Sequence, residues 1–171
     1  MKDIYGSIKL LSEKIVRQCA GQGLKLSTAE SCTGGMISAA ITSVSGSSSV
    51  IELGVCSYSN RIKRDVLGVS EQTLDKFSEY STQCAEEMAK GALKLSGADF
   101  AVSTSGVAGP SGGTDNAPVG TVFISVCGKG QTKTEKHVFE DKGRDYIRAA
   151  AAEKALCMLL EIISTQSKGE I

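Results

Sequence analysis

Residues 24–43 read LKLSTAESCTGGMISAAITS and contain the signals of a strand, a tight turn and a helix in immediate succession. The segment 24–29 has the short apolar pattern of a strand, and 36–43 has the apolar spacing of a helix. A polar turn with two adjacent glycines separates them. This order predicts an α/β unit with hydroxyl groups at the carboxyl edge of a sheet.

The segments on either side continue the alternation of strands and helices. Periodicity and glycine or serine end signals predict helices over 8–19, 61–67, 70–77, 82–95 and 146–163. Further strands are predicted over 53–58, 98–104, 119–127 and 132–139, the last two forming a hairpin. We therefore expect one domain over residues 1–171, an α/β fold in three α/β/α layers with a mixed, mostly parallel sheet of about five strands.

The composition excludes several functional classes. The 171 residues include 19 Lys and Arg against 19 Asp and Glu, and 41% of the residues are hydrophobic. Nucleic-acid binders normally carry an excess of basic residues, so we expect no nucleic-acid partner. No apolar run approaches the roughly 20 residues that span a bilayer, so we expect no membrane partner.

The cysteines and the first residues indicate the compartment. The six cysteines are widely spaced and form no C-x-x-C pair, so we expect mostly buried thiols, with neither a zinc site nor a disulfide framework. Residues 1–16 are interrupted by charges and lack the apolar core of a secretion signal. We expect a cytoplasmic protein without metal or cofactor.

The turn Ser31-Cys32-Thr33-Gly34-Gly35 is the first candidate for chemistry. A hydroxyl between a strand and a helix points into the crevice beyond the sheet, and the unpaired amides of the helix N-terminus can bind an oxyanion or a phosphate. Alternatively, Ser31 or Thr33 merely caps the helix.

A nucleophilic serine needs a base, and the choice is narrow. The only histidine, His137, lies inside a predicted hairpin strand, far from any turn. This position argues against a Ser-His-Asp triad. Lys63 follows the second strand, and it can act as a base only if burial or the neighbouring Arg61 and Arg64 lower its pKa from about 10.4. Alternatively, Lys63 belongs to the solvated face of a short helix.

A glycine-rich loop provides the remaining candidates. Residues 105–118 hold both prolines and four glycines, and a loop of this length in a compact domain is usually functional. Its Ser111 matches G-x-S-x-G but lacks the flanking strand and helix of a nucleophile elbow, so we expect it to contact ligand. Ser105 should lie beside Ser31 at the edge of the sheet.

Two arginines stand one helical turn apart at the start of the last helix. Arg144 and Arg148 have the spacing of a carboxylate or phosphate clamp. They are equally placed to pair with the neighbouring acidic residues, Glu140, Asp141 and Asp145.

Together these motifs resemble the CinA C-terminal domain family, whose stand-alone members are PncC-type nicotinamide-nucleotide amidases. The resemblance runs in order from about residue 8 to 163. It rests on Thr28–Gly35 (TAESCTGG), Tyr58-Ser59-Asn60 with Lys63, Leu67-Gly68-Val69, Gly106–Pro110 with Gly112-Gly113, Pro118-Val119-Gly120, and Arg144 with Arg148.

The resemblance implies a CinA-like fold and a metal-free hydrolysis of the carboxamide of nicotinamide mononucleotide to nicotinate mononucleotide and ammonia. It implies that Ser31 is the nucleophile, Lys63 its base or proton shuttle, and Tyr58 a polar partner near them. The substrate-binding residues it implies are Thr33, Gly34, Gly35, Ser105, Gly106, Gly109 and Arg144. Its partner would be this small nucleotide. Whether the chain acts alone or as a homo-oligomer is left open by the sequence.

The sequence departs from the family pattern at two places. Ser105 stands where the family usually has threonine, and Lys142-Gly143-Arg144 stands where it usually has G-D-R. The alternative to an amidase is a nucleotide-binding module of the same fold without turnover. A DNA-linked role, suggested by the family's competence-related name, disagrees with the balanced charge.

Overall fold

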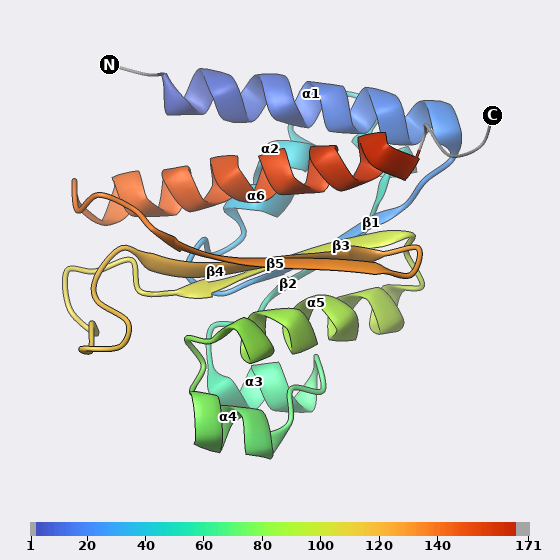
Figure 1. Cartoon of the computed structure of the whole chain (residues 1–171). Helices are drawn as coiled ribbons and strands as arrows, with labels where there is room; N and C mark the ends of the chain where they lie inside the picture. Colours follow the sequence, from blue (N-terminus) through green and yellow to red (C-terminus); the bar gives the residue numbers. More distant parts are fainter. Residues whose placement is uncertain (1–2, 167–171) are drawn as a thin grey trace.

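The computed structural model describes residues 3–166 and has the three predicted α/β/α layers (Figure 1). The central sheet has the strand order β2-β1-β3-β4-β5. Its strands are β1 (Leu26–Glu30), β2 (Ile51–Cys56), β3 (Phe100–Gly106), β4 (Thr121–Gly128) and β5 (Gln131–Val138). Strands β2, β1 and β3 are parallel, and β4 runs antiparallel to both β3 and β5. Only β4 opposes the common direction, so the predicted mixed, mostly parallel sheet is confirmed.

The burial of the strands follows their places in the sheet. Every residue of β1, β3 and β4 is buried, whereas exposure varies along the edge strands β2 and β5. A strand covered on both faces carries a continuous run of small and apolar residues instead of an alternating pattern. This is why 98–104 and 119–127 are recognisable as strands from their sequence.

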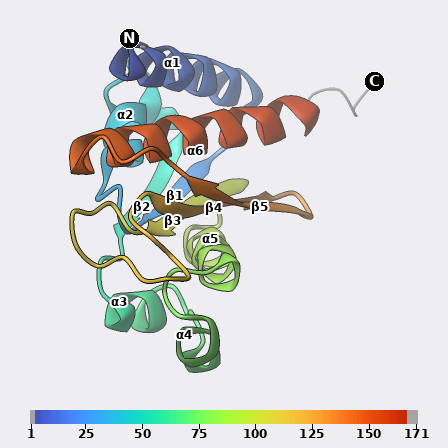
Figure 2. The same cartoon turned by 60° about the vertical axis from the view of Figure 1, so that its left-hand side comes forward.

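Six helices cover the two faces of the sheet within residues 3–166 (Figures 1 and 2). One face carries α1 (Ile4–Gln22), α2 (Met36–Thr42) and α6 (Arg144–Gln166), with α1 packed on α6 and α2. On the other face α5 (Thr82–Ser96) packs on the sheet, and α3 (Asn60–Asp65) and α4 (Glu71–Phe77) lie on the far side of α5. Each face has its own apolar cluster, around Ile15 and Leu159 on the first and around Met88 and Ala101 on the second.

The predicted end signals operate at several helices. Gly23 and Gly97 end α1 and α5 in the left-handed conformation that glycine adopts without strain. Ser70 caps α4 by accepting a hydrogen bond from the amide of Thr73. Local chemistry therefore fixes where these helices begin and end.

Several element boundaries differ from the prediction. Strand β3 runs over Phe100–Gly106 instead of 98–104, so Ser105 belongs to the strand and not to the loop. The loop 43–49 contains a short 3-10 helix, Ser47–Ser49, and β2 ends at Cys56, so that Tyr58 lies beyond the strand. Helix α6 begins at Arg144, two residues earlier than predicted, which places Arg144 and Arg148 in its first turns.

Neither a membrane-crossing helix nor a disulfide occurs in the described part of the chain. No helix within residues 3–166 is long and apolar enough to cross a bilayer. All six cysteines are free, and Cys19, Cys32, Cys84 and Cys127 are buried as expected.

The register of the three parallel strands creates the site. Glu30, the last residue of β1, pairs with Cys56 on β2 and with Thr104 on β3. The carboxyl ends of the three strands are therefore nearly level. In open α/β sheets the segments that follow such strand ends line the ligand crevice.

Candidate functional site

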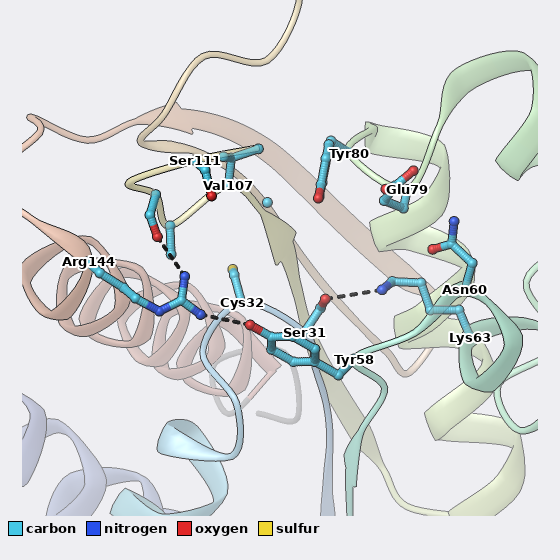
Figure 3. A pocket seen from close by; sticks show the side chains of 13 residues that line it. Ser31, Cys32, Tyr58, Asn60, Lys63, Glu79, Tyr80, Val107, Ser111 and Arg144 are labelled. Atoms are coloured by element: carbon cyan, nitrogen blue, oxygen red, sulfur yellow. Dashed lines mark hydrogen bonds between the residues drawn. The ribbon is translucent and has the colours of Figure 1, made fainter. Parts of the chain in front are cut away.

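A cavity of about 200 Å³ lies beyond the carboxyl ends of β1, β2 and β3 (Figure 3). Its lining comes from the segments after β1 and β2, from the start of α6, from residues 79–80 and from the glycine-rich loop. The lining residues are Ser31, Cys32, Tyr58, Asn60, Lys63, Glu79, Tyr80, Gly106, Val107, Ala108, Gly109, Ser111 and Arg144.

Ser31 is the first residue after β1, and its hydroxyl faces the cavity (Figure 3). Its backbone amide donates to the carbonyl of Thr104 on β3 at 2.9 Å, which ties the turn to the neighbouring strand. Gly34 and Gly35 both have positive φ, 62° and 93°, which a side chain rarely tolerates. The two glycines thus allow the chain to turn sharply from β1 into α2.

Lys63 is buried beside Ser31. The lysine is only 1% exposed, and its Nζ donates to Ser31 Oγ at 3.1 Å and to the carbonyl of Ser57 at 3.0 Å. It lies on α3, whose N-terminus is capped by the hydroxyl of Ser59. The alternative that Lys63 belongs to a solvated helix face is therefore wrong.

Burial is the main cause of a lowered pKa at Lys63, because an ammonium group loses its hydration there. Glu79 acts in the opposite direction, since its negative charge favours the protonated amine. The sequence suggested that Arg61 and Arg64 would also lower this pKa. In the structure both arginines instead pair with Asp65 at the surface. A buried amine with a lowered pKa is suited to accept a proton.

Glu30 is a site residue that sequence reasoning missed. Its buried carboxylate accepts hydrogen bonds from the amides of Gly35, Ile37 and Ser38 at 2.8–3.0 Å, and from the hydroxyl of Thr33 at 2.8 Å. The available signal was a charged residue at the end of an otherwise uncharged strand, just before a helix.

Two of the amides expected to bind an anion at the start of α2 are therefore already used within the protein. The amide of Gly35 donates to Glu30, the amide of Gly34 donates to the carbonyl of Ser31, and the hydroxyl of Thr33 bonds Glu30 and Thr104. Thr33, Gly34 and Gly35 do not line the cavity. The carboxylate of Glu30 occupies the position that the sequence suggested for a ligand, because a negative charge is stabilised at a helix N-terminus.

Arg148 holds the same turn from its other side. Its guanidinium donates to the carbonyl of Cys32 at 3.2 Å and to the carbonyl of Thr33 at 3.0 Å. Its contact with Asp145 is longer, at 3.9 Å. Of the two predicted clamp arginines, Arg148 thus binds the protein backbone instead of lining the cavity.

Arg144 lines the cavity and joins two of its walls. It donates to the carbonyl of Gly109 at 2.7 Å and to the hydroxyl oxygen of Tyr58 at 2.7 Å (Figure 3). Tyr58 makes no hydrogen bond to Ser31 or Lys63 within the described residues. Its phenol oxygen accepts from Arg144, so its own proton is free to be donated to a ligand.

The glycine-rich loop lines the cavity only in part. Gly106, Gly109 and Ser111 are lining residues, as expected. Ser105 is not, because its hydroxyl donates to the main-chain carbonyl of Glu79 at 2.7 Å. The placement of Ser105 beside Ser31 is therefore corrected: the strand alternation directs its side chain to the face that carries α5.

Cys32 also lines the cavity, next to Ser31 (Figure 3). Burial raises the pKa of its thiol to about 12, so the thiol is protonated near neutral pH. Because the thiolate is the nucleophilic form of cysteine, Cys32 is unsuited to attack a substrate.

His137 lies away from this cavity. It sits on β5, opposite Val122 of β4, with its ring stacked on Phe139. It does not line the cavity, so a triad with Ser31 is excluded by position. Within residues 3–166, no group of three His, Cys, Asp or Glu side chains is arranged to hold a metal ion.

Comparison with known proteins assigns the chain to a family. The CinA C-terminal domain model matches residues 8–163. A CinA-like protein from Shewanella pealeana is 45% identical over 151 residues, which cover 88% of this chain and 36% of that protein. The chain therefore spans about a third of the length of such curated relatives.

Solved structures support the same assignment. The competence/damage inducible protein CihA from Agrobacterium tumefaciens is 43% identical with a TM-score of 0.90, over 91% of this chain and 95% of that one. A CinA superfamily protein from Klebsiella pneumoniae is 36% identical with a TM-score of 0.88, over 92% and 98%. From its sequence and its fold, the chain belongs to the CinA C-terminal domain family.

Proposed function

We propose that this protein hydrolyses the carboxamide of nicotinamide mononucleotide, giving nicotinate mononucleotide and ammonia, with Ser31 as the nucleophile. The observation that carries the proposal is the 3.1 Å contact between Ser31 Oγ and the Nζ of the buried Lys63. A serine hydroxyl is a weak nucleophile until an adjacent base removes its proton. Lys63 supplies that base, and the resemblance to the amidases of the family supplies the substrate.

Lys63 enters the reaction as a neutral amine. It accepts the proton of the Ser31 hydroxyl while Oγ attacks the carboxamide carbon. The carbon–nitrogen bond then breaks, and the ammonium form of Lys63 returns the proton to the departing ammonia. The carbonyl of Ser57 holds the amine beside Ser31 by accepting one of its N–H groups. For the attack, the bond to Ser31 reverses direction: the neutral amine turns its lone pair to Oγ and accepts the hydroxyl proton.

Water completes the cycle. Lys63 takes a proton from water, the hydroxide attacks the ester on Ser31, and the carboxylic acid leaves as Oγ regains the proton. The sum is one amide and one water converted into one acid and one ammonia. We assign Tyr58 the role of donating its phenol proton, left free by the bond from Arg144, to the negative oxygen of the tetrahedral intermediate.

Ammonia release from nicotinamide mononucleotide tests the proposal directly. The wild-type chain should release ammonia in the presence of a chelator, and Ser31→Ala should reduce kcat by at least about 1000-fold at an unchanged melting temperature. Ser48→Ala is the control, because this exposed serine is not among the residues that line the cavity.

Two results would contradict the proposal. Unchanged turnover in Ser31→Ala would exclude Ser31 as the nucleophile. A rise in melting temperature with the mononucleotide, but no ammonia after long incubation, would identify a binding module without turnover.

A further inference from the structure

We propose that Glu79 and Tyr80 form a subsite for a positively charged ring, so that the cavity selects N-substituted pyridinium carboxamides over neutral ones. This inference rests on the proposed function, because it names the part of the substrate that the cavity recognises beside Ser31. It assigns a specificity role to two residues that follow α4, outside every motif of the sequence.

Glu79 is the acidic residue among those that line the cavity. Its side chain is partly buried, and its carboxylate has no hydrogen bond or ion pair with any residue of the described range 3–166. Other carboxylates near the site are used internally, as Glu30 shows with its bonds to α2. A partly desolvated carboxylate without a partner is stabilised by a cationic ligand.

The segment that carries Glu79 is held in place on both sides. Ser78 has a φ of 67°, which is rare for a residue with a side chain, and its hydroxyl accepts a hydrogen bond from the amide of Tyr80 at 3.2 Å. Ser81 donates to the carbonyl of Ser78 at 2.9 Å, and Ser105 donates to the carbonyl of Glu79 at 2.7 Å. These contacts fix the backbone from which Glu79 and Tyr80 reach the cavity.

The charges of the cavity are separated in space. Figure 3 shows Arg144 on one side of the Ser31 hydroxyl and Glu79 on the other, with Tyr80 between them above the hydroxyl. The carboxylate of Glu79 also acts electrostatically on Lys63, so it lies within range of the reacting centre. A ligand with a cation near its carboxamide and an anion farther away matches this arrangement.

A pyridinium mononucleotide has this distribution of charge. In nicotinamide mononucleotide one ring carbon separates the positive nitrogen from the carbon that bears the carboxamide, and the phosphate lies beyond the ribose. The carboxylate of Glu79 attracts the ring charge directly, and the aromatic face of Tyr80 attracts a cation through its quadrupole. Arg144 is the cation on the side left for the phosphate.

Comparison of oxidised and reduced nicotinamide mononucleotide isolates the ring charge. The two share ribose, phosphate and carboxamide, but the dihydropyridine ring of the reduced form is uncharged. We would measure the Kd of each by calorimetry in the Ser31→Ala background, so that neither is consumed. The oxidised form should bind about tenfold more tightly, and the further change Glu79→Gln should bring the ratio close to one.

Matched variants separate charge from shape. Glu79→Asp keeps the charge and should retain most of the preference, whereas Tyr80→Leu should reduce it and Tyr80→Phe should retain it. Glu52→Gln is the control. It also removes one negative charge, but at an exposed position near the start of β2, the end of the strand away from the cavity. Melting temperatures of all variants should agree within a few degrees.

The outcomes are distinct from those of the ammonia assay. If Glu79→Gln leaves the preference for the oxidised form unchanged, the inference is overturned. An equal loss of affinity for both forms also overturns it, because Glu79 would then contact the ribose or shape the cavity. If Glu79→Gln does not fold, Glu79→Asp and Tyr80→Leu decide the question by the same ratio. If the wild-type chain releases no ammonia, the proposed function is wrong. The ratio of the two Kd values still decides, on its own, whether the cavity prefers the charged ring.

Discussion

The amine of Lys63 lies 3.1 Å from the hydroxyl oxygen of Ser31, although α2, the loop 43–49 and β2 separate the two residues in sequence. Two short connections at adjacent strand ends bring them together, since Ser31 follows β1 and Lys63 lies on the helix after β2. Because Lys63 is also bonded to the carbonyl of Ser57, its amine has little freedom to leave Ser31.

Lys63→Met should lower turnover strongly and leave the fold intact. The change removes the base, so kcat should fall by about 100- to 10,000-fold, the usual range for general-base catalysis. Methionine has a similar length and no charge to bury, so the melting temperature should stay the same or rise. Steady-state ammonia release and thermal unfolding measure both effects, and a retained kcat would contradict the assignment of the base.

The pH dependence of kcat should follow the protonation of Lys63. Burial lowers the pKa of Lys63, so the neutral, active amine appears at a lower pH than for an exposed lysine, and kcat should rise with pH through that value. Negative charge at Glu79 favours the protonated amine, so Glu79→Gln should move the midpoint to lower pH. Glu52→Gln should not move it, and a shift of Glu79→Gln towards higher pH would refute the electrostatic account.

Stability should depend on pH through the same lysine. Because the pKa of Lys63 is lower in the folded chain than in the unfolded chain, the unfolded state binds more protons between the two values. The free energy of unfolding therefore gains a contribution that rises with pH from the folded pKa up to the unfolded pKa. Denaturant titrations of the wild type and Lys63→Met at several pH values should differ by this rising contribution, and parallel curves would exclude it.

Cys32→Ala should keep most of the activity. The pKa of the Cys32 thiol is raised to about 12 by burial, so a thiolate is almost absent near neutral pH. We expect kcat within about threefold of the wild type, since only a small side chain in the cavity wall is lost. Loss of turnover in Cys32→Ala, with activity retained in Ser31→Ala, would assign the nucleophile to the thiol instead.

Glu30→Gln should weaken both the fold and the placement of Ser31. The amide side chain replaces one acceptor oxygen with a donor, so one or more of the amides of Gly35, Ile37 and Ser38 loses its partner. An unsatisfied buried donor costs about 1–3 kcal/mol, which denaturant unfolding should detect. At a temperature where the variant is folded, kcat should fall more than KM rises; an unchanged kcat would limit Glu30 to stability.

Several features were predictable because they depend on neighbouring residues alone. Glycine and serine end signals located the helices, the continuous apolar run identified β3, and the turn after β1 placed Ser31 at the mouth of the sheet. The glycine-rich loop was recognisable from its prolines and glycines. These patterns act over a few residues, so they can be read without knowing the rest of the fold.

Other features were decided only by packing between distant segments. From the sequence, Lys63 was either a buried base or part of a solvated helix face. The amides of Gly34 and Gly35 were expected to be free. The tertiary structure buries Lys63 against the turn after β1, and it fills the start of α2 with the carboxylate of Glu30. Which way a polar side chain points depends on the desolvation and the partners that the whole fold provides.

The sequence by itself thus determined the order of strands and helices, the family and the serine at the strand end. Only the tertiary structure decided that the amine of Lys63 is buried against Ser31 and that Arg148 holds the turn while Arg144 holds Tyr58. It alone shows that Glu79 lines the cavity without a hydrogen-bond or ion-pair partner in the described residues. Local periodicity sets the elements, whereas the electrostatics of a site arise where segments far apart in sequence meet.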